Sequence, residues 1–453
     1  MVRKSLNAEG VAVVNNRDVQ TYQKFHNRML WTRFVTVVLG LWLLASPATF
    51  AYSQSALIKS DLISGVLLIL FGFLSMSFPL RGWIWGGCFV GIWLQMAPLI
   101  FWAEQPVVYL NDTLIGILAI AFCVLVPLRP AAFEVGPQLP AGWSYNPSSW
   151  QQRVPIIFFA IVGWFVARYL SAYQLHFTDK VWPYHDGTVQ VLTSTVAHNF
   201  PVSDAGLGAV AYCLEAIMGA KGGVRRWHTM PWLVVIFGIL VIPLGFTSIV
   251  LVTLQPLVVG AWCVLCLIIA ACMLVMLSLT VDEMVCVCQY IRQEMRNSGR
   301  GFWDVLIRGS NYTRDETDPR TPLVYSSLKD FVKTMVLGVS LPWNLVVTAI
   351  LGAWLLFVDS FLGFSGLVAK SGNVMGALTV VCSIIAWAEV ARALRFLNLL
   401  LMAWLIVGSI ILPGATMTTI IHGAILGGVV IVLSLFKGSK IKEKYGTWQK
   451  LIF

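Results

Sequence analysis

The sequence predicts an all-α, polytopic integral membrane protein of about twelve transmembrane helices, arranged as three blocks of four. Composition supports this prediction, because 58% of the 453 residues are hydrophobic, only 11% are charged, and the mean hydropathy is +0.78. A soluble domain carries roughly 25% charged residues. The lack of charge therefore excludes an ordinary soluble globular protein, a disordered chain and a nucleic-acid-binding protein.

Twelve apolar segments approach the roughly 20 residues that an α-helix needs to cross a bilayer. They cover residues 34–52, 61–79, 83–102, 112–128, 155–173, 204–220, 231–253, 257–279, 336–358, 373–390, 396–413 and 418–436. The predicted organisation is an N-terminal tail, a first, a middle and a last block of four spans, a basic connector and a basic tail. In chain order, the tail, first block, middle block, connector, last block and final tail cover residues 1–33, 34–128, 143–298, 299–335, 336–436 and 437–453.

The basic residues set the expected orientation. With these spans, 27 of the 31 Lys and Arg residues fall on one side of the membrane, and such an excess marks the cytoplasmic side. We therefore expect a multi-pass protein of a bacterial inner membrane with both termini and the basic connector in the cytoplasm. The Ala-Ser-Pro-Ala segment at 45–48 resembles a cleavage site. The polar leader before it is too long for a signal peptide, so we expect no cleavage.

The first and last blocks contain internal repeats. A Gly-x-Trp-Leu pattern begins at Gly40, returns 51 residues later at Gly91 and returns again at Gly352. A degenerate fourth copy contains Trp404. This pattern, with the Ser-Pro that follows it in the first copy, is similar to the SPW repeat, a bacterial membrane repeat named after its Ser-Pro-Trp signature. The resemblance is good for the first block and weak for the last, and it implies no catalytic residue.

A polar residue follows the repeat tryptophan by 19 residues in three copies, as Asp61, Asp112 and Asn373. All three stand at the start of a predicted span, where a short polar side chain caps exposed amide groups. Helix capping is therefore the favoured interpretation. The alternative is a proton relay through Asp61 and Asp112, since carboxyl groups inside a membrane are candidates for function.

The middle block contains a closely spaced cysteine pair, Cys263-x-x-Cys266, at the predicted periplasmic start of the eighth span. Residues three apart share a helix face, which brings the two Cα atoms within disulfide range. Such a pair is redox-active when the helix start lowers the pKa of one thiol. The alternative is that both cysteines are ordinary apolar packing residues.

The middle block resembles the vitamin K epoxide reductase family, in its four helices, its long outer segment and its Trp-Cys-x-x-Cys-Leu motif. The resemblance implies that Cys263 and Cys266 are catalytic and exchange electrons with a quinone. It implies that Cys266 is the thiol nearer the quinone and that Cys263 exchanges with a partner protein. It also implies a quinone pocket lined by Trp262, Ser194 and Ser203.

The sequence departs from that family in its outer segment. The family carries a second cysteine pair there, which shuttles electrons to a substrate protein, whereas residues 174–203 contain no cysteine. Thr193 and Ser194 stand where the family has a cysteine and a polar residue. Either a periplasmic thioredoxin-like protein meets the membrane pair directly, or the block has lost its redox chemistry. In the second case the chain is a non-catalytic scaffold or a subunit of a membrane complex.

Other chemically notable residues give weaker signals. Arg168 and Glu215 lie inside spans, and we interpret them first as a buried structural pair and second as a quinone contact. Cys286-x-Cys288 lacks the histidines of a zinc site. We interpret His176, His185 and His198 as part of a solvated loop, and we expect neither a metal nor a nucleotide cofactor. The basic connector is expected to lie on anionic lipid, and a transporter finds little support because no broken helix pair is evident.

Overall fold

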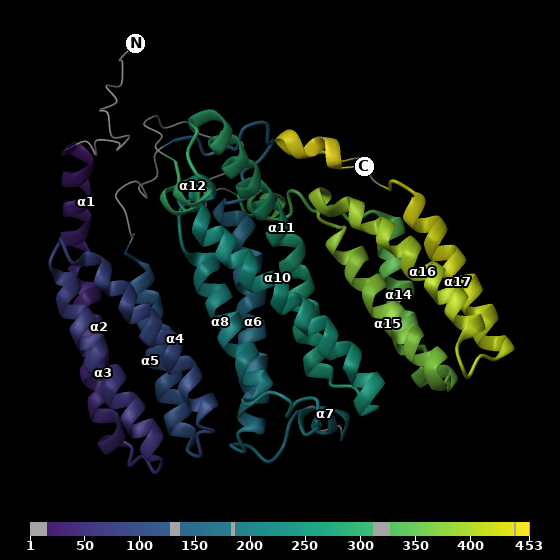
Figure 1. Cartoon of the computed structure of the whole chain (residues 1–453), viewed down its shortest axis with the longest axis horizontal. Coiled ribbons are helices and arrows are strands. Elements are labelled where there is room, and N and C mark those ends of the chain that lie inside the picture. Colours follow the sequence, from purple (N-terminus) through teal and green to yellow (C-terminus); the bar gives the residue numbers. More distant parts are fainter. Residues whose placement is uncertain (1–15, 127–135, 183–185, 311–326, 439–440, 453) are drawn as a thin grey trace. The chain divides into compact units, whose positions relative to one another are not determined.

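The computed structural model describes residues 16–126, 136–182, 186–310, 327–438 and 441–452, and within them it contains helices and no β-strand. The all-α prediction is therefore confirmed. The chain divides into two compact units, Met1–Phe133 and Glu134–Phe453 (Figure 1). Each unit is described by itself.

The first unit is built from two helical hairpins. Its helices are α1 (Asn16–Arg28), α2 (Leu30–Thr49), α3 (Ser55–Met76), α4 (Ile84–Ile100) and α5 (Pro106–Val124), with the short η1 (Arg81–Trp83) before α4. In the α2–α3 hairpin, a Cβ added to Gly40 would lie 2.7 Å from the carbonyl oxygen of Gly65. In the α4–α5 hairpin, a Cβ added to Gly91 would lie 2.8 Å from the carbonyl oxygen of Gly116. Each predicted repeat is thus one hairpin, and its glycines permit the close approach of two helices.

The repeat tryptophans join one hairpin to the other. Trp42 Nε1 donates to Oδ1 of Asn111 at 2.9 Å, and Trp93 Nε1 donates to Oγ of Ser60 at 2.9 Å. Each acceptor immediately precedes the aspartate of the opposite repeat. The two bonds are therefore equivalent, because in each the repeat tryptophan of one hairpin donates to the residue before the aspartate of the other hairpin.

The predicted capping role of Asp61, Asp112 and Asn373 is wrong. Helix α3 begins at Ser55 and α5 begins at Pro106, so both aspartates lie in the second turn of a helix. Both are fully buried and adjacent to each other, and no described residue gives their carboxylate oxygens a well-formed hydrogen bond. Asn373 lies inside α15, where its Nδ2 donates to Oδ2 of Asp359 at 2.9 Å.

The second unit contains the remaining helices. They are α6 (Trp150–Gln174), α7 (Asp186–Leu192), α8 (Asp204–Ala220), α9 (Arg226–Thr229), α10 (Pro231–Leu254), α11 (Val264–Ser298), α12 (Phe302–Arg308), α13 (Leu328–Met335), α14 (Trp343–Leu362), α15 (Gly366–Ile385), α16 (Leu397–Ile411) and α17 (Met417–Leu435). Three short elements join or follow them: η3 (Gln255–Val259), η4 (Glu389–Phe396) and η5 (Gly446–Leu451).

Across the described part of the chain, 11 helices are long and apolar enough to cross a membrane. Helix α8 has 17 residues and coincides with the predicted span 204–220. Arg153, near the start of α6, donates to the carbonyl oxygens of Gly219 and Lys221, both at 3.1 Å. The C-terminal end of α8 therefore lies beside the N-terminal end of α6, so α8 runs back along α6. At 1.5 Å per residue, α8 is about 25 Å long, slightly less than the bilayer core of about 30 Å.

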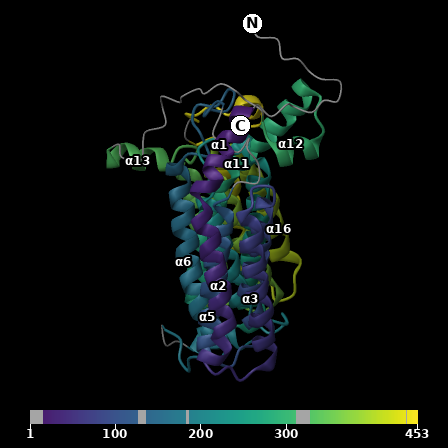
Figure 2. The same cartoon turned by 90° about the vertical axis from the view of Figure 1, so that its left-hand side faces the viewer.

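The second unit has two chemically different ends (Figures 1 and 2). Helix α7 lies at one end, and α12 and the C-terminal segment lie at the other. The α12 end holds a buried polar layer, in which Arg226 and Glu283 form an ion pair at 2.5 Å and the hydroxyl of Tyr445 donates to Glu389 at 2.8 Å. These contacts gather the loops that carry most basic residues of this unit at one end, as the charge distribution predicts.

Candidate functional site

The cysteine pair lies at the start of α11, at the α7 end of the second unit. Cys263 and Cys266 form a disulfide, with their Cα atoms 5.3 Å apart. Cys263 is the N-cap residue of α11, and its sulfur accepts a hydrogen bond from the backbone N–H of Cys266 at 3.2 Å. Cys263 is fully buried, whereas Cys266 is half-buried. The structure thus joins the two residues that the sequence analysis selected as catalytic.

The turn before Cys263 holds the backbone of the cysteine pair in place. After α10 the chain forms one π-helical turn, η3, and then Gly260 adopts a left-handed φ of +71° that allows the chain to enter α11. Such π-helical turns are frequent at functional sites. The buried side chain of Gln255 accepts a hydrogen bond at Oε1 from the backbone N–H of Cys263 at 2.9 Å. Sequence analysis missed Gln255, although a glutamine before Pro256 interrupts an otherwise apolar run.

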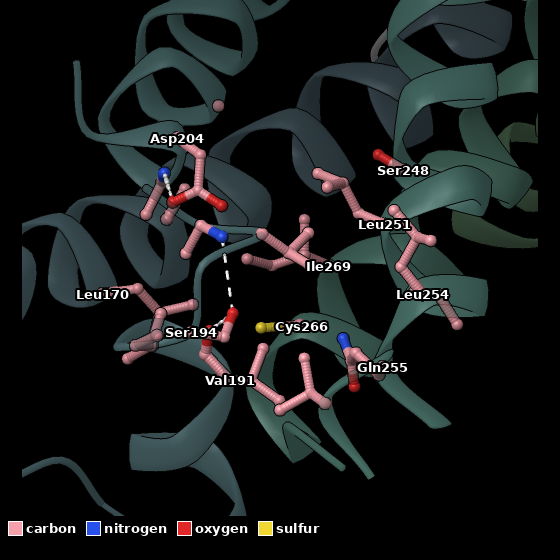
Figure 3. A pocket seen from close by; sticks show the side chains of 18 of the residues that line it. Leu170, Val191, Ser194, Asp204, Ser248, Leu251, Leu254, Gln255, Cys266 and Ile269 are labelled. Atoms are coloured by element: carbon pink, nitrogen blue, oxygen red, sulfur yellow. Dashed lines mark hydrogen bonds between the residues drawn. The ribbon is translucent and has the colours of Figure 1, made fainter. Parts of the chain in front are cut away.

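A cavity of about 120 Å³ lies beside Cys266 (Figure 3). An apolar cavity of about 150 Å³ accommodates benzene, so this one has the scale of a single small ring. Its lining is mostly apolar. The residues that line it are Ala167, Leu170, Val191, Leu192, Ser194, Val196, Ala197, Asp204, Ala205, Gly208, Tyr212, Ser248, Leu251, Val252, Leu254, Gln255, Val259, Cys266 and Ile269.

The outer segment covers the buried cysteine. Val181 and Leu192 from this segment pack with Cys263 in one apolar cluster. At the start of α7, a Cβ added to Gly187 would lie 2.7 Å from the carbonyl oxygen of Trp262. The segment therefore lies directly on the backbone that carries the cysteine pair. The side chain of Cys263 is fully buried beneath this cover.

Comparison with protein-family models matches residues 154–281 to the vitamin K epoxide reductase family. The matched range includes both cysteines and every residue of the cavity lining. The chain contains a vitamin K epoxide reductase family domain. It also contains an SPW repeat domain at residues 30–126, in the first unit. No curated protein and no solved structure matches the chain.

The two matches confirm both resemblances found in the sequence. The vitamin K epoxide reductase domain supports a membrane oxidoreductase of that general type. The degenerate repeats of the last block lie outside the matched range and stay a prediction; there Trp354 Nε1 donates to His422 at 3.0 Å and Trp404 Nε1 donates to Ser371 at 3.2 Å. These bonds join one predicted repeat to the other, as in the SPW domain.

The three predicted pocket residues of the vitamin K epoxide reductase domain have different positions. Ser194 lines the cavity. Ser203 does not, because its buried hydroxyl caps α8 by accepting from Gly206 N–H at 2.9 Å. Trp262 also lies outside the lining, and its Nε1 donates to Ser360 Oγ at 3.3 Å. The polar lining residues that sequence analysis missed include Ser248, whose signal is only a lone hydroxyl in an apolar span.

The predicted Arg168–Glu215 pair is not formed. Glu215 is fully buried, and neither of its carboxylate oxygens has a hydrogen-bond partner in the described part of the chain. The Arg168 guanidinium lies over the Trp164 ring, 5.3 Å from its centroid. The prediction failed because sequence position gives the depth of a side chain along a helix but not the direction in which it points.

The remaining candidate ligands do not gather into a site. His176 and His198 are exposed, in agreement with a solvated loop, and His185 lies outside the described residues. Cys286 is buried and Cys288 is exposed. Within the described residues no group of three or more His, Cys, Asp or Glu side chains is arranged to hold a metal ion.

Proposed function

We propose that this chain is a membrane thiol–quinone oxidoreductase in which Cys263 and Cys266 alternate between dithiol and disulfide. The observation that carries the proposal is the position of Cys266 in the lining of a mostly apolar cavity with room for one small ring. In the proposed reaction, the two thiols lose two electrons and two protons as the S–S bond forms. A quinone held in the cavity accepts both electrons and both protons and leaves as hydroquinone.

The polar groups of the lining suit the oxygens of a quinone. The Oε1 atom of Gln255 already accepts the Cys263 N–H, so the Gln255 amide nitrogen is oriented as a donor. Ser194 and Ser248 add two hydroxyl groups to the same lining. A few polar groups in an apolar cavity are typical of sites that bind and orient a small ligand.

The start of α11 places a backbone N–H donor at the sulfur of Cys263. Unpaired backbone N–H groups and the helix dipole stabilise negative charge at a helix N-terminus, and the Cys263 sulfur already accepts the Cys266 N–H. A thiolate is the reactive form in disulfide exchange. In our proposal, Cys263 exchanges with the dithiol of a periplasmic thioredoxin-like protein, which is oxidised to a disulfide as the membrane pair is reduced.

The proposed location follows from the charges. The loops with most basic residues of the second unit lie at the α12 end, opposite the cysteine pair. If that end faces the cytoplasm of a bacterial inner membrane, the cysteine pair faces the oxidising periplasm. The C-terminal segment at the α12 end is then cytoplasmic, and the basic tail before the first span places the N-terminus in the cytoplasm by the same charge rule.

Thiol trapping in native membranes tests the proposal. The membranes are first reduced, then incubated with or without an oxidised quinone, and free thiols are alkylated with a mass tag. We expect quinone to protect two thiols from the tag in the unaltered chain and none in Cys266→Ser. The exposed Cys288, at the other end of α11, provides the control variant Cys288→Ser, in which two thiols should still be protected. If quinone leaves the pair reduced, the chain is a non-catalytic scaffold or complex subunit.

A further inference from the structure

Two buried arginines lie at the end of the second unit opposite the cysteine pair. Arg392 and Arg395 belong to η4, the 3₁₀ helix between α15 and α16, and each is only 1% exposed. Side chains three residues apart are eclipsed in a 3₁₀ helix, so the two guanidinium groups project from the same side. A buried positive charge is costly unless an anion and hydrogen-bond acceptors surround it.

The protein itself satisfies these arginines only in part. Arg392 Nη2 donates to Ser340 Oγ, and Arg395 Nη1 donates to the Lys437 carbonyl oxygen at 3.3 Å. The nearby carboxylate of Glu389 accepts instead from the Tyr445 hydroxyl at 2.8 Å. Three buried N–H donors, Nε and Nη1 of Arg392 and Nε of Arg395, have no partner among the described residues. Neither arginine forms an ion pair with a described carboxylate.

The SPW domain has an arginine at the equivalent position whose hydrogen-bond donors are mostly satisfied by the protein itself. Arg33 precedes Trp42 by nine residues, as Arg395 precedes Trp404. Arg33 Nη1 donates to a backbone carbonyl oxygen at 2.6 Å, and its Nη2 faces the His26 ring at 3.3 Å, which leaves only Nε without a partner. In the last block the two arginines stand together with fewer internal acceptors. No described residue supplies the acceptors that would complete this second arrangement.

We propose that Arg392 and Arg395 bind the phosphate group of an anionic phospholipid. Guanidinium groups offer paired donors that match phosphate oxygens, and the bonds are strengthened by opposite charge. The site lies at the end of the bundle where basic residues gather, and basic pockets between membrane helices bind anionic headgroups. Free inorganic phosphate has the same chemistry, and the experiment distinguishes the two sources.

The test uses the purified full chain with its disulfide intact. The unaltered chain is compared with the double variant Arg392→Gln/Arg395→Gln. Arg292→Gln is the control, because Arg292 is exposed and lies toward the C-terminal end of α11. Each is placed in vesicles of phosphatidylcholine alone or with phosphatidylglycerol, and lipid retention is measured by native mass spectrometry. A parallel sample in detergent receives inorganic phosphate, with thermal unfolding as the readout.

We expect the unaltered chain and Arg292→Gln to retain phosphatidylglycerol, and the double variant to bind it at least about tenfold more weakly. Stabilisation by inorganic phosphate without lipid preference would support the site and identify free phosphate as its ligand. Equal retention of both lipids with no effect of phosphate on the unaltered chain would overturn the proposal. This comparison decides the question even if the double variant does not fold.

Discussion

Filling the cavity beside Cys266 gives the sharpest test of the proposed quinone site. Gly208 lines this cavity from α8, and a Cβ added there would meet only the Ala167 Cβ, at an ordinary contact distance of 3.8 Å. Gly208→Ala is therefore sterically free and should stabilise α8 by about 0.5–1 kcal/mol, because alanine has the higher helix propensity. In Gly208→Phe, the phenyl ring would occupy most of a cavity of about 120 Å³.

The expected loss follows from the burial of one ring. Burying an aromatic side chain contributes about 1.5–3 kcal/mol, and a quinone excluded from the cavity loses about this much. At 1.36 kcal/mol per factor of ten, the quinone-dependent kcat/KM of Gly208→Phe should fall by about 10- to 150-fold. Quinone reduction is followed spectroscopically with dithiothreitol as electron donor, and Gly208→Ala serves as the matched control.

A second measurement separates loss of the site from loss of the fold. Reduction of the Cys263–Cys266 disulfide by dithiothreitol is followed in the same variants by alkylation, and it should be unchanged in Gly208→Phe. If the phenylalanine variant reduces quinone as fast as the alanine variant, the cavity is not the site at which quinone reacts. Our assignment of Cys266 as the thiol nearer the quinone would then lose its support.

Three further predictions concern other parts of the molecule. Arg226→Met should destabilise the chain by about 3–5 kcal/mol because it leaves Glu283 buried without its partner, and Arg226→Met/Glu283→Leu should recover most of the loss in thermal unfolding. Burial lowers the pKa of His228 to about 4 from 6.5. The unfolded chain therefore binds a proton that the folded chain does not, so stability should fall between pH 6.5 and about 4, and a His228→Gln variant should lack that part of the slope. Asp61 and Asp112 are too close and too deeply buried for both to carry charge. Infrared spectra should show a protonated carboxyl band that is weaker in Asp61→Asn/Asp112→Asn than in the unaltered chain, and a band of equal strength in both would contradict this view.

The spans were predictable because hydropathy responds to lipid exposure, but their ends were not. The predicted span 61–79 begins six residues after the real start of α3 at Ser55, because the first six residues of α3 include Lys59 and two serines. That shift alone turned the buried Asp61 into an apparent cap. Helix α11 extends to Ser298, well beyond the predicted residue 279, because Asp282 and Glu283 are buried against Tyr145 and Arg226, tertiary partners that a hydropathy window does not contain.

The candidate site was likewise predictable only in part from the sequence. The i, i+3 spacing of Cys263 and Cys266 is local, so the sequence alone predicted that both sulfurs meet at one helix start. Gln255 and Gly208 matter only through the packing of α8 and α10 around the cavity, and no local pattern marks them. Ser203 was placed in the pocket by resemblance, yet it is the N-cap residue of α8, a role for which serine is a favoured type.

The position of the cysteine pair at one end of the bundle bears on how the proposed reaction would be coupled to the energy of the membrane. The thiols that release electrons and the cavity that receives them lie side by side at the α7 end, so neither electrons nor protons need to cross the bilayer. Moving one charge across 100 mV costs about 2.3 kcal/mol, but here no charge is moved. Turnover in energised vesicles should therefore not respond to the membrane potential, and the reaction would neither store nor consume it.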